Sequence, residues 1–395
     1  MSDQSVLRDW RLNWHDDEFK WRPDQSWARR GQWLEERELA RRARRRRDRG
    51  FFGDELWGTP LFKALHTPAA LERFGLPAFE NEAALAIWLG IPLTRLRWYT
   101  FSRLGSPVWH YVRYVIPKRS GGERVILAPK RELKGLQRKV LREILEKLPL
   151  SEPSHGFRKT RSIVTNAVPH TGKKYVLNLD LKDFFPSITF RRVRGLFVSL
   201  GYSFAVGTTL ALLCTESDRA VMQRPDQRYY VSLNPRHIIQ GAPTSPYLAN
   251  LIARDLDLRL NGLARKHQVD YTRYADDLTF SGDDLDAILR ILSVAKVIIK
   301  EEGFVLNPKK TRLYRRSGRQ SVTGLVVNEK VNTPREMRRL VRAILHNAQK
   351  GGLNSQNQAK RPNFRAYVQG LIGHIGQSDP NRAAALLRQL AAIPD

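Results

Sequence analysis

Acidic residues stand at two places where strand-like segments end. Asp276 and Asp277 close the tetrad 274–277, which lies between two runs rich in β-branched and aromatic residues. Asp180 directly follows the apolar run 176–179. Adjacent carboxylates repel each other unless cations lie beside them, and Asp oxygens are hard ligands that Mg²⁺ favours. An Asp-Asp pair is also common in surface turns, but a carboxylate leaving a buried strand needs a partner. The three aspartates therefore predict a shared metal site.

The chemistry open to such a site is phosphoryl transfer. Three carboxylates can hold two Mg²⁺ ions about 3.5–4 Å apart, the arrangement used for in-line displacement at phosphorus. One ion would lower the pKa of a primer hydroxyl, and the other would hold a triphosphate and the departing pyrophosphate. We therefore expect Asp180, Asp276 and Asp277 to be both catalytic residues and metal ligands.

The segments around these aspartates alternate between strand and helix patterns. A strand is expected over 175–179 and a hairpin over 271–280, with the Asp pair at its tip. Helical spacing of apolar residues predicts helices over 190–200, 246–260 and 285–302. Cys214, the single cysteine, follows the apolar run 210–213 and is expected in the core. No internal repeat is visible.

A basic region precedes this part of the chain. Two strand-like runs, 111–116 and 124–127, flank a Gly-rich turn, and a helix is expected over 133–148. Between Arg103 and Arg142 there are 11 basic and 2 acidic residues. This pattern predicts a basic hairpin and a basic helix.

The two ends of the chain differ in composition from its middle. Five of the nine tryptophans lie in the first fifty residues, before an Arg-rich run at 41–49 that includes Arg44, Arg45 and Arg46. We expect this run to contact a nucleic-acid backbone, although a solvated helix face or a linker has the same composition. Residues 60–100 have helical patterns, and residues 331–395 hold 10 basic and 3 acidic residues. Thr333-Pro334-Arg335-Glu336 predicts a capping box with Pro at the first helical position.

The overall composition narrows the class of protein. The chain has 395 residues, of which 68 are Lys or Arg and 39 are Asp or Glu, so its formal net charge is +29. Such an excess favours a polyanionic partner, nucleic acid before an anionic membrane. One cysteine excludes an internal disulfide and zinc fingers. No apolar stretch approaches a membrane span, and no signal pattern opens the chain, so we expect a cytoplasmic protein without a membrane partner.

Several motifs together resemble a known family. The tetrad 274–277, with Asp180 upstream and Gln240-Gly241-Ala242-Pro243-Thr244-Ser245-Pro246 between them, resembles the palm of reverse transcriptases. The elements 155–158, 166–170 and 322–324 resemble bacterial retron reverse transcriptases, over about residues 96–330 in all. Ile239 departs from the pattern, because the family often has Pro before this Gln, and its backbone freedom affects the positioning of that loop.

The resemblance implies roles for residues that bind the nucleotide. Lys118 and Arg124 flank the turn where the fingers of such polymerases grip a triphosphate, although both are also ordinary turn charges. Phe185 matches the ring that excludes a ribose 2′-hydroxyl, and Gln240 matches a residue that contacts the sugar and base. A lysine that protonates pyrophosphate matches Lys310, with Lys309 as the alternative.

RNA contact is implied for Asn166 and His170, which belong to the family's Asn-Ala-x-x-His element. For His170 a hydrogen-bonded structural role is an equal alternative, because no nearby Cys or second His makes a metal site.

The resemblance also implies the fold and the activity. We expect an α+β right-hand polymerase, with an N-terminal helical extension over 1–95, fingers and an antiparallel palm over 96–330, and a helical RNA-binding thumb over 331–395. It would copy a cognate structured non-coding RNA into DNA from deoxynucleoside triphosphates with two Mg²⁺ ions. Synthesis would begin at a guanosine 2′-hydroxyl and give a branched RNA–DNA product, msDNA. An anti-phage role with a separately encoded effector or toxin is implied as well.

Two other classes of protein share parts of this pattern. A group II intron or diversity-generating reverse transcriptase would have the same palm, but the former usually carries a longer region after it. A non-catalytic RNA-binding antitoxin scaffold is the alternative outside enzymes, and the intact set of three aspartates argues against it.

Overall fold

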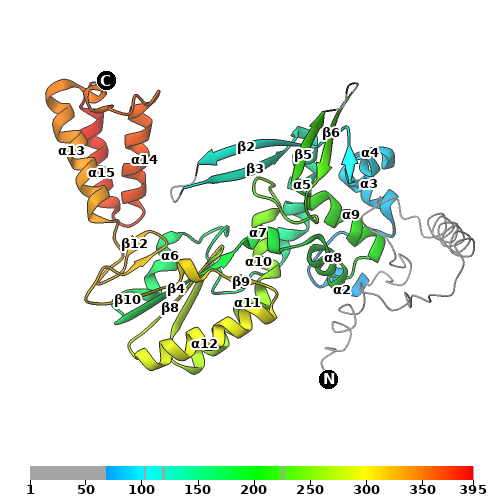
Figure 1. Ribbon diagram of the computed structural model, residues 1–395, viewed down its shortest axis with the longest axis horizontal. Coiled ribbons are helices and arrows are strands. Elements are labelled where there is room, and N and C mark those ends of the chain that lie inside the picture. Colours follow the sequence, from blue (N-terminus) through cyan, green and yellow to red (C-terminus); the bar gives the residue numbers. More distant parts are fainter. Residues whose placement is uncertain (1–67, 102–103, 118–120, 224, 226, 395) are drawn as a thin grey trace, which may run out of the picture. The chain divides into compact units, whose positions relative to one another are not determined.

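The structure is a computed structural model that describes residues 68–101, 104–117, 121–223, 225 and 227–394 (Figure 1). All of these belong to one of the two compact units into which the chain divides. The Trp-rich segment and Arg44, Arg45 and Arg46 lie outside the described residues, and so does Lys118.

The central feature is an antiparallel sheet with the strand order β10-β4-β8-β7. Strand β4 is mostly buried, and its buried side chains point to both faces of the sheet. Strand β9 pairs with the end of β4, at Leu181 and Lys182. The strands are β4 (Tyr175–Lys182), β7 (Asp270–Tyr274), β8 (Asp277–Gly282), β9 (Val305–Leu306) and β10 (Arg312–Arg315).

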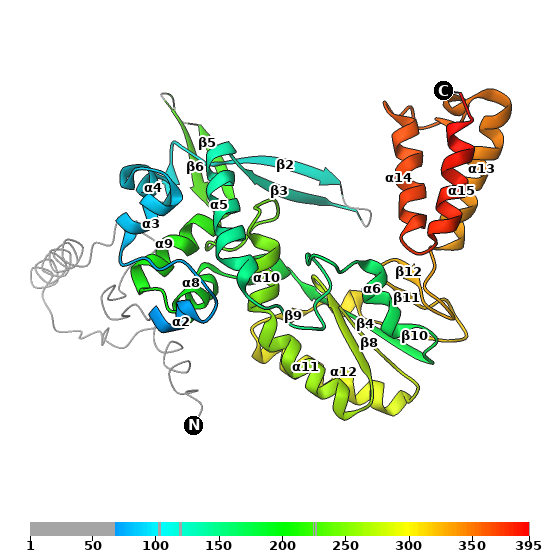
Figure 2. The same ribbon diagram turned by 180° about the vertical axis from the view of Figure 1, so that it is seen from behind.

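Helices pack on this palm sheet. α11 and α12 lie side by side and contact strands β7, β8 and β4 (Figures 1 and 2). The palm helices are α6 (Ile163–Ala167), α7 (Phe184–Ser187), α8 (Phe190–Ser199), α10 (Ser245–Ile252), α11 (Arg254–Lys266) and α12 (Leu285–Glu301), with the 3₁₀ turns η4 (Val168–His170) and η5 (Pro308–Lys310). A two-stranded ladder of β11 (Ser321–Val322) and β12 (Leu325–Val326) follows.

The fingers combine a long hairpin with helices and a second sheet. Strands β2 and β3 pair in register from Tyr111 opposite Pro129 to Pro117 opposite Glu123. The second sheet has the order β1-β6-β5. The elements are α2 (Pro68–Glu72), α3 (Glu82–Leu89), α4 (Leu93–Thr100), β1 (Gly105–Ser106), β2 (Tyr111–Pro117), β3 (Glu123–Pro129), α5 (Arg131–Glu143), η3 (Leu145–Lys147), α9 (Phe204–Cys214), β5 (Arg219–Gln223) and β6 (Arg228–Ser232).

One hydrophobic core runs through the fingers and the palm. It includes Leu71 and Leu85 as well as Phe304 near the end of the palm. The described residues before 96 therefore share this core with the rest of the fingers and the palm. Cys214 lies fully buried in this core, as expected.

The last three helices form a bundle with a core of its own. They are α13 (Arg335–Gly351), α14 (Phe364–Gly376) and α15 (Pro380–Ala391), and the 3₁₀ turn η6 (Leu353–Gln356) lies between α13 and α14. Their buried side chains cluster only with one another, from Val341 to Ile393. The three helices lie within residues 331–395, where a helical thumb is expected.

The expected capping box at the start of the thumb is wrong. Helix α13 begins at Arg335 with Pro334 as N-cap, and no side chain caps it. Thr333 lies one residue too early, and its buried hydroxyl is 3.0 Å from the Ser378 hydroxyl instead. The Thr side chain thus ties the start of α13 to the end of α14.

Two helix bounds also differ from expectation. The helix expected over 133–148 ends at Glu143, and a 3₁₀ turn follows. The helix expected over 246–260 is two helices, because Ala253 has the non-helical dihedrals φ −83° and ψ 6°. In the described part of the chain, no helix is both long and apolar enough to cross a membrane.

Candidate active site

Strand register brings the predicted aspartates together. Asp180 near the end of β4 lies directly opposite Asp277 at the start of β8. Asp276 occupies the two-residue turn between β7 and β8, after Ala275. The backbone N–H of Leu181 donates to the Asp276 carbonyl at 3.0 Å, which ties the turn to β4. The hairpin and the central strand therefore present three carboxylates at one edge of the sheet.

Asp180 is buried, with 4% of its surface exposed, and both of its oxygens accept hydrogen bonds. Lys310 Nζ donates to Oδ1 at 2.6 Å, and Asn307 Nδ2 donates to Oδ2 at 3.0 Å. The Asn307 backbone N–H also donates to the Asp180 carbonyl, at 2.8 Å. The segment 307–310 thus fixes the position of the Asp180 carboxylate.

The other two carboxylates are poorly compensated. Loss of water contact raises the pKa of Asp277 to about 7, and repulsion by Asp276 and Asp180 adds to the effect. The Asp277 side chain keeps an exposed surface, so solvent screens part of this repulsion. Desolvation also raises the pKa of Asp276, although a hydrogen bond from its own backbone N–H opposes the shift. The three aspartates at this edge of the sheet therefore carry more negative charge than the neighbouring Lys and Arg side chains neutralise.

This donor set suits a hard divalent cation. Carboxylate oxygens are the ligands that Mg²⁺ prefers, and a bound cation would relieve the repulsion between the aspartates. Among the described residues, however, no three His, Cys, Asp or Glu side chains are arranged to hold a metal ion as they stand. Asp180 is engaged by Lys310 and Asn307, through one hydrogen bond to each carboxylate oxygen.

Lys310, rather than Lys309, reaches the aspartates. Its ammonium group pairs with Asp180, while 60% of the side chain stays exposed. The hydrogen bond to Asp180 raises the pKa of Lys310. A protonated lysine therefore lies beside the carboxylates, open to whatever occupies the surface above them.

The fingers hairpin meets the 240–246 motif at this site. Arg124 on β3 lies close enough to Asp276 to lower the pKa of that carboxyl. The Leu127 backbone N–H donates to the Gln240 carbonyl at 2.8 Å. Gly241 has φ +117°, and a Cβ there would lie 2.6 Å from the Leu127 carbonyl oxygen, so only glycine fits. These contacts fix the loop even though Ile239 stands where the family often has Pro.

Phe185 lies in a group of aromatic rings just beyond Asp180. Its ring meets those of Phe157 and Phe184 nearly edge-on, at centroid distances of 6.1 and 5.9 Å. Phe157 itself is 45% exposed and has φ +58°, a conformation that bulky residues rarely adopt. The sequence analysis does not name Phe157 as a site residue. The one indication in the sequence is that Phe157 lies in the element 155–158, which resembles the family.

The RNA contacts expected of Asn166 and His170 do not fit their burial. His170 is fully buried, with Nδ1 2.7 Å from the Ser281 hydroxyl and Nε2 2.7 Å from the Thr272 hydroxyl. Burial lowers its pKa to about 3, so the ring is neutral. Asn166 is 1% exposed. Neither side chain has a surface to offer RNA, and His170 takes the structural role that was the alternative.

Asn307 is a further residue of the candidate site that sequence reasoning missed. It binds Asp180 through both its backbone and its side chain, as described above. The sequence feature that could have revealed Asn307 is its position three residues before Lys310, in the sequence Asn307-Pro308-Lys309-Lys310.

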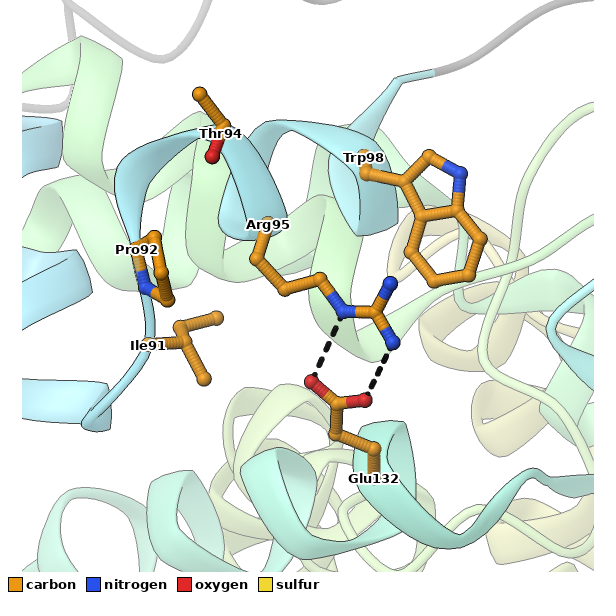
Figure 3. A pocket seen from close by; sticks show the side chains of 6 residues that line it. All are labelled: Ile91, Pro92, Thr94, Arg95, Trp98 and Glu132. Carbon is orange, nitrogen blue, oxygen red and sulfur yellow. Dashed lines mark hydrogen bonds and ion pairs between the residues drawn. The ribbon is translucent and has the colours of Figure 1, made fainter.

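A pocket of about 540 Å³ lies in the fingers instead, between the start of α4 and α5 (Figure 3). Arg95 donates from Nε and Nη2 to the two carboxylate oxygens of Glu132, at 3.1 and 2.6 Å. The Arg95 guanidinium lies 4.1 Å from the centroid of the Trp98 ring. None of the candidate catalytic residues lines this pocket.

Comparisons with known proteins identify the family. A family model described as reverse transcriptase (RNA-dependent DNA polymerase) matches residues 116–333, more than half of the chain. The chain is 47% identical over 321 residues to the retron Mx65 reverse transcriptase of Myxococcus xanthus, covering 81% of this chain and 74% of that protein. It is 40% identical over 281 residues to the retron Ec86 reverse transcriptase of Escherichia coli, covering 70% and 80%.

Solved structures with a similar arrangement are more distant. A telomerase from Candida albicans in complex with a fragment of telomeric RNA has a TM-score of 0.41 at 11% identity, covering 70% of this chain and 56% of that one. A foamy viral protease-reverse transcriptase in complex with an RNA/DNA hybrid has a TM-score of 0.37 at 17% identity, covering 74% and 35%. The fold assignment rests on the family match and on the fingers, palm and thumb described above. With sequence identity of this extent over most of both chains, the chain belongs to the retron-type reverse transcriptases and is an RNA-directed DNA polymerase.

Proposed function

We propose that Asp180, Asp276 and Asp277 hold two Mg²⁺ ions and form the centre of DNA synthesis. The observation that carries the proposal is the register of β4 against β8, which sets Asp180 opposite Asp277 with Asp276 in the adjoining turn. When bound, the two ions activate the primer hydroxyl and neutralise the charge that develops on the departing pyrophosphate. The raised pKa values of Asp276 and Asp277 support this role, since a site of excess negative charge attracts cations.

The chain's own side chains then bind and orient the nucleotide. Arg124, together with Lys118, which lies outside the described residues, binds the triphosphate. Gln240, anchored through its carbonyl to Leu127, faces the sugar and base. The Phe185 ring, packed against Phe157, closes the space that a ribose 2′-hydroxyl would need. Lys310 holds a proton beside Asp180 and delivers it to the leaving pyrophosphate.

The substrate in this proposal is one cognate structured non-coding RNA that serves as both template and primer. Synthesis begins at a guanosine 2′-hydroxyl and produces a branched RNA–DNA molecule. The support is the identity to retron reverse transcriptases over most of the chain. Neither alternative gains support: both relatives reported above are retron enzymes rather than group II intron or diversity-generating ones, and all three aspartates are present.

The test is to purify the full chain from its native host and to sequence the RNA and DNA that remain bound. We expect one RNA species joined to DNA that is complementary to part of it. Treatment with an enzyme that cleaves 2′,5′-phosphodiester bonds should separate the two strands. An Asp276→Asn chain, expressed in parallel, should yield the RNA without the DNA. Bound DNA with a free 5′ end before that treatment would contradict 2′-hydroxyl priming.

The proposal extends to anti-phage defence with a separately encoded effector. If it is correct, cells carrying the complete locus should restrict phage plaques, and the Asp276→Asn chain should abolish the restriction. Equal plaque numbers with and without the wild-type locus, over a broad phage panel, would remove the defence role.

A further inference from the structure

A fully buried ion pair lies beneath the turn that carries Asp276. Arg273 on β7 and Asp257 on α11 both have 0% of their surface exposed. Arg273 donates from Nε to Asp257 Oδ1 and from Nη2 to Oδ2, both at 2.7 Å. This two-pronged arrangement fixes the plane of the guanidinium, which a lysine cannot reproduce.

Further hydrogen bonds orient the two partners. The Tyr271 hydroxyl donates to Asp257 Oδ1 at 2.9 Å, and the Ser151 hydroxyl donates to Oδ2. Arg273 Nη1 donates to Asn250 Oδ1 at 3.1 Å. The guanidinium is therefore held by Asp257 on α11 and Asn250 on α10, and Asp257 is itself held by Tyr271 and Ser151.

The same guanidinium reaches the catalytic turn. Arg273 Nη1 also donates to the Ala275 carbonyl oxygen, at 3.1 Å. Ala275 has φ +57°, in the left-handed region that costs an L-residue free energy. The peptide group held through this carbonyl is the one whose N–H belongs to Asp276. Fixing it sets the direction in which the chain enters the two aspartates.

The loop before α6 is joined to the same place. Asn250 Nδ2 donates to the Gly156 carbonyl at 2.8 Å, and the His155 backbone N–H donates to the Arg273 carbonyl at 2.8 Å. A Cβ on Gly156 would lie 2.7 Å from the Ala275 nitrogen, so this loop packs directly on the turn. The turn is thus enclosed below by Arg273 and on one side by Gly156.

Burying an ion pair is a poor way to gain stability, because the cost of removing two charges from water can exceed their attraction. A network of this kind is better explained by the geometry it imposes. We propose that Arg273, aligned by Asp257 and Asn250, is a positioning residue that holds Ala275 in its left-handed conformation and thereby orients Asp276 and Asp277 for catalysis. The inference rests on the proposed role of these two aspartates.

The test uses two substitutions in the full-length chain, alone and combined. Arg273→Lys keeps the charge but loses the fixed fork, so we expect kcat for primer extension to fall about tenfold or more, with KM for the nucleotide little changed. Ala275→Gly allows a positive φ without strain. In the Arg273→Lys background it should restore kcat by about fivefold, and in the wild-type background it should restore nothing.

Hydrogen exchange gives a readout that does not depend on activity. The Leu181 amide, which donates to the Asp276 carbonyl, should exchange faster in Arg273→Lys and return toward the wild-type rate when Ala275→Gly is added. The matched control is Arg236→Lys, which changes a buried arginine paired with Glu216 and bonded to the Leu212 carbonyl. It should leave kcat and Leu181 exchange unchanged.

The outcomes separate positioning from stability. Arg273→Lys with kcat within twofold of wild type overturns the proposal, and so does a loss that Ala275→Gly fails to recover. If Arg273→Lys does not fold, Asp257→Asn with and without Ala275→Gly makes the same comparison, with the same two results counting against the proposal. Failure of the proposed function is distinct, because full activity of Asp276→Asn would show it whatever Arg273 does.

Discussion

At the scale of single residues, the charge on the Asp277 carboxylate is needed for metal binding but destabilises the folded chain. Desolvation and the neighbouring charges of Asp276 and Asp180 raise its pKa from 3.8 to about 7. A raised pKa in the folded state means that the contribution to stability is fully present below about pH 4 and is lost as pH rises through about 7. Above pH 7 the ionised group therefore destabilises the metal-free protein.

This predicts that Asp277→Asn stabilises the metal-free chain in a pH-dependent way while removing activity. In the presence of a chelator, its thermal midpoint should exceed that of wild type by a few degrees at pH 8, and the difference should shrink at pH 5. Unfolding scans at the two pH values measure it. An equal difference at both would mean that the charge of Asp277 is not the cause.

Phe185 makes a second prediction at this scale. Phe185→Val or Phe185→Ala should admit ribonucleotides, because the smaller side chain opens space beside the second carbon of the sugar. Extension with deoxy- and ribonucleotides in parallel gives the ratio of incorporation, and extension with deoxynucleotides serves as the internal control. An unchanged ratio would show that the ring next to Phe157 does not select the sugar.

At the scale of elements, the sequence best predicted the helices and strands whose residue types follow a regular local pattern. The two runs rich in β-branched and aromatic residues around the tetrad 274–277 indicated the hairpin, and the Asp pair indicated its tip. Periodicity did not reveal the break at Ala253, since the apolar spacing continues across it while the backbone leaves the helix. The pairing of Arg273 with Asp257 was equally hidden, because it depends on how α11 packs against β7.

The ion pair between Arg95 on α4 and Glu132 on α5 gives a prediction about how two helices stabilise each other. The Arg95 hydrogen bonds lower the pKa of Glu132 to about 2, and a hydrogen bond involving Tyr99 adds to the effect. A lowered pKa means that the contribution to stability is present above about pH 4.5 and is lost as pH falls through about 2. Both side chains are 42% exposed, so solvent screening keeps the contribution small.

Glu132→Gln should therefore lower the thermal midpoint slightly at pH 7, and the difference from wild type should narrow as pH falls below 4.5. Glu143→Gln on the same helix is the matched control and should change little. If the two variants behave alike at every pH, the contact between α4 and α5 adds nothing to stability.

At the scale of the whole molecule, the net charge of +29 should separate general from specific RNA binding. Phosphate contacts weaken as salt rises, with a slope of roughly 0.7–0.9 per neutralised phosphate. Shape and 2′-hydroxyl contacts are screened less. We expect the thumb over 331–395, which has its own core, to contribute discrimination between RNAs, and the Arg-rich run at 41–49 to add mainly salt-sensitive affinity.

Two triple variants of equal charge change test this division. Arg335, Arg339 and Arg342 changed to Gln in α13 should reduce the preference for a cognate over a scrambled RNA. Arg44, Arg45 and Arg46 changed to Gln should flatten the salt dependence for both RNAs alike. Binding across a salt series measures both effects. If the second variant loses the preference while the first keeps it, the roles are reversed.

The family, the palm and its three aspartates could be predicted from sequence because the motifs are local and their spacing is specific. What could not be predicted depends on contacts between distant segments. Burial of Asn166 and His170 follows from packing against β7 and β8, and the hydroxyl of Thr333 was taken by Ser378 rather than by its own helix. Local pattern gives no information about such partners.

The central claim is that Asp180 and Asp276 serve the transfer step itself, and primer extension with Mg²⁺ tests it most directly. Asp180→Asn and Asp276→Asn each remove one charged ligand, so extension should fall at least about a hundredfold, while RNA binding persists. Asp183→Asn, which changes an exposed neighbour that tolerates its left-handed backbone as Asn, is the control and should keep activity. Near-normal extension by either Asp180→Asn or Asp276→Asn would contradict the account.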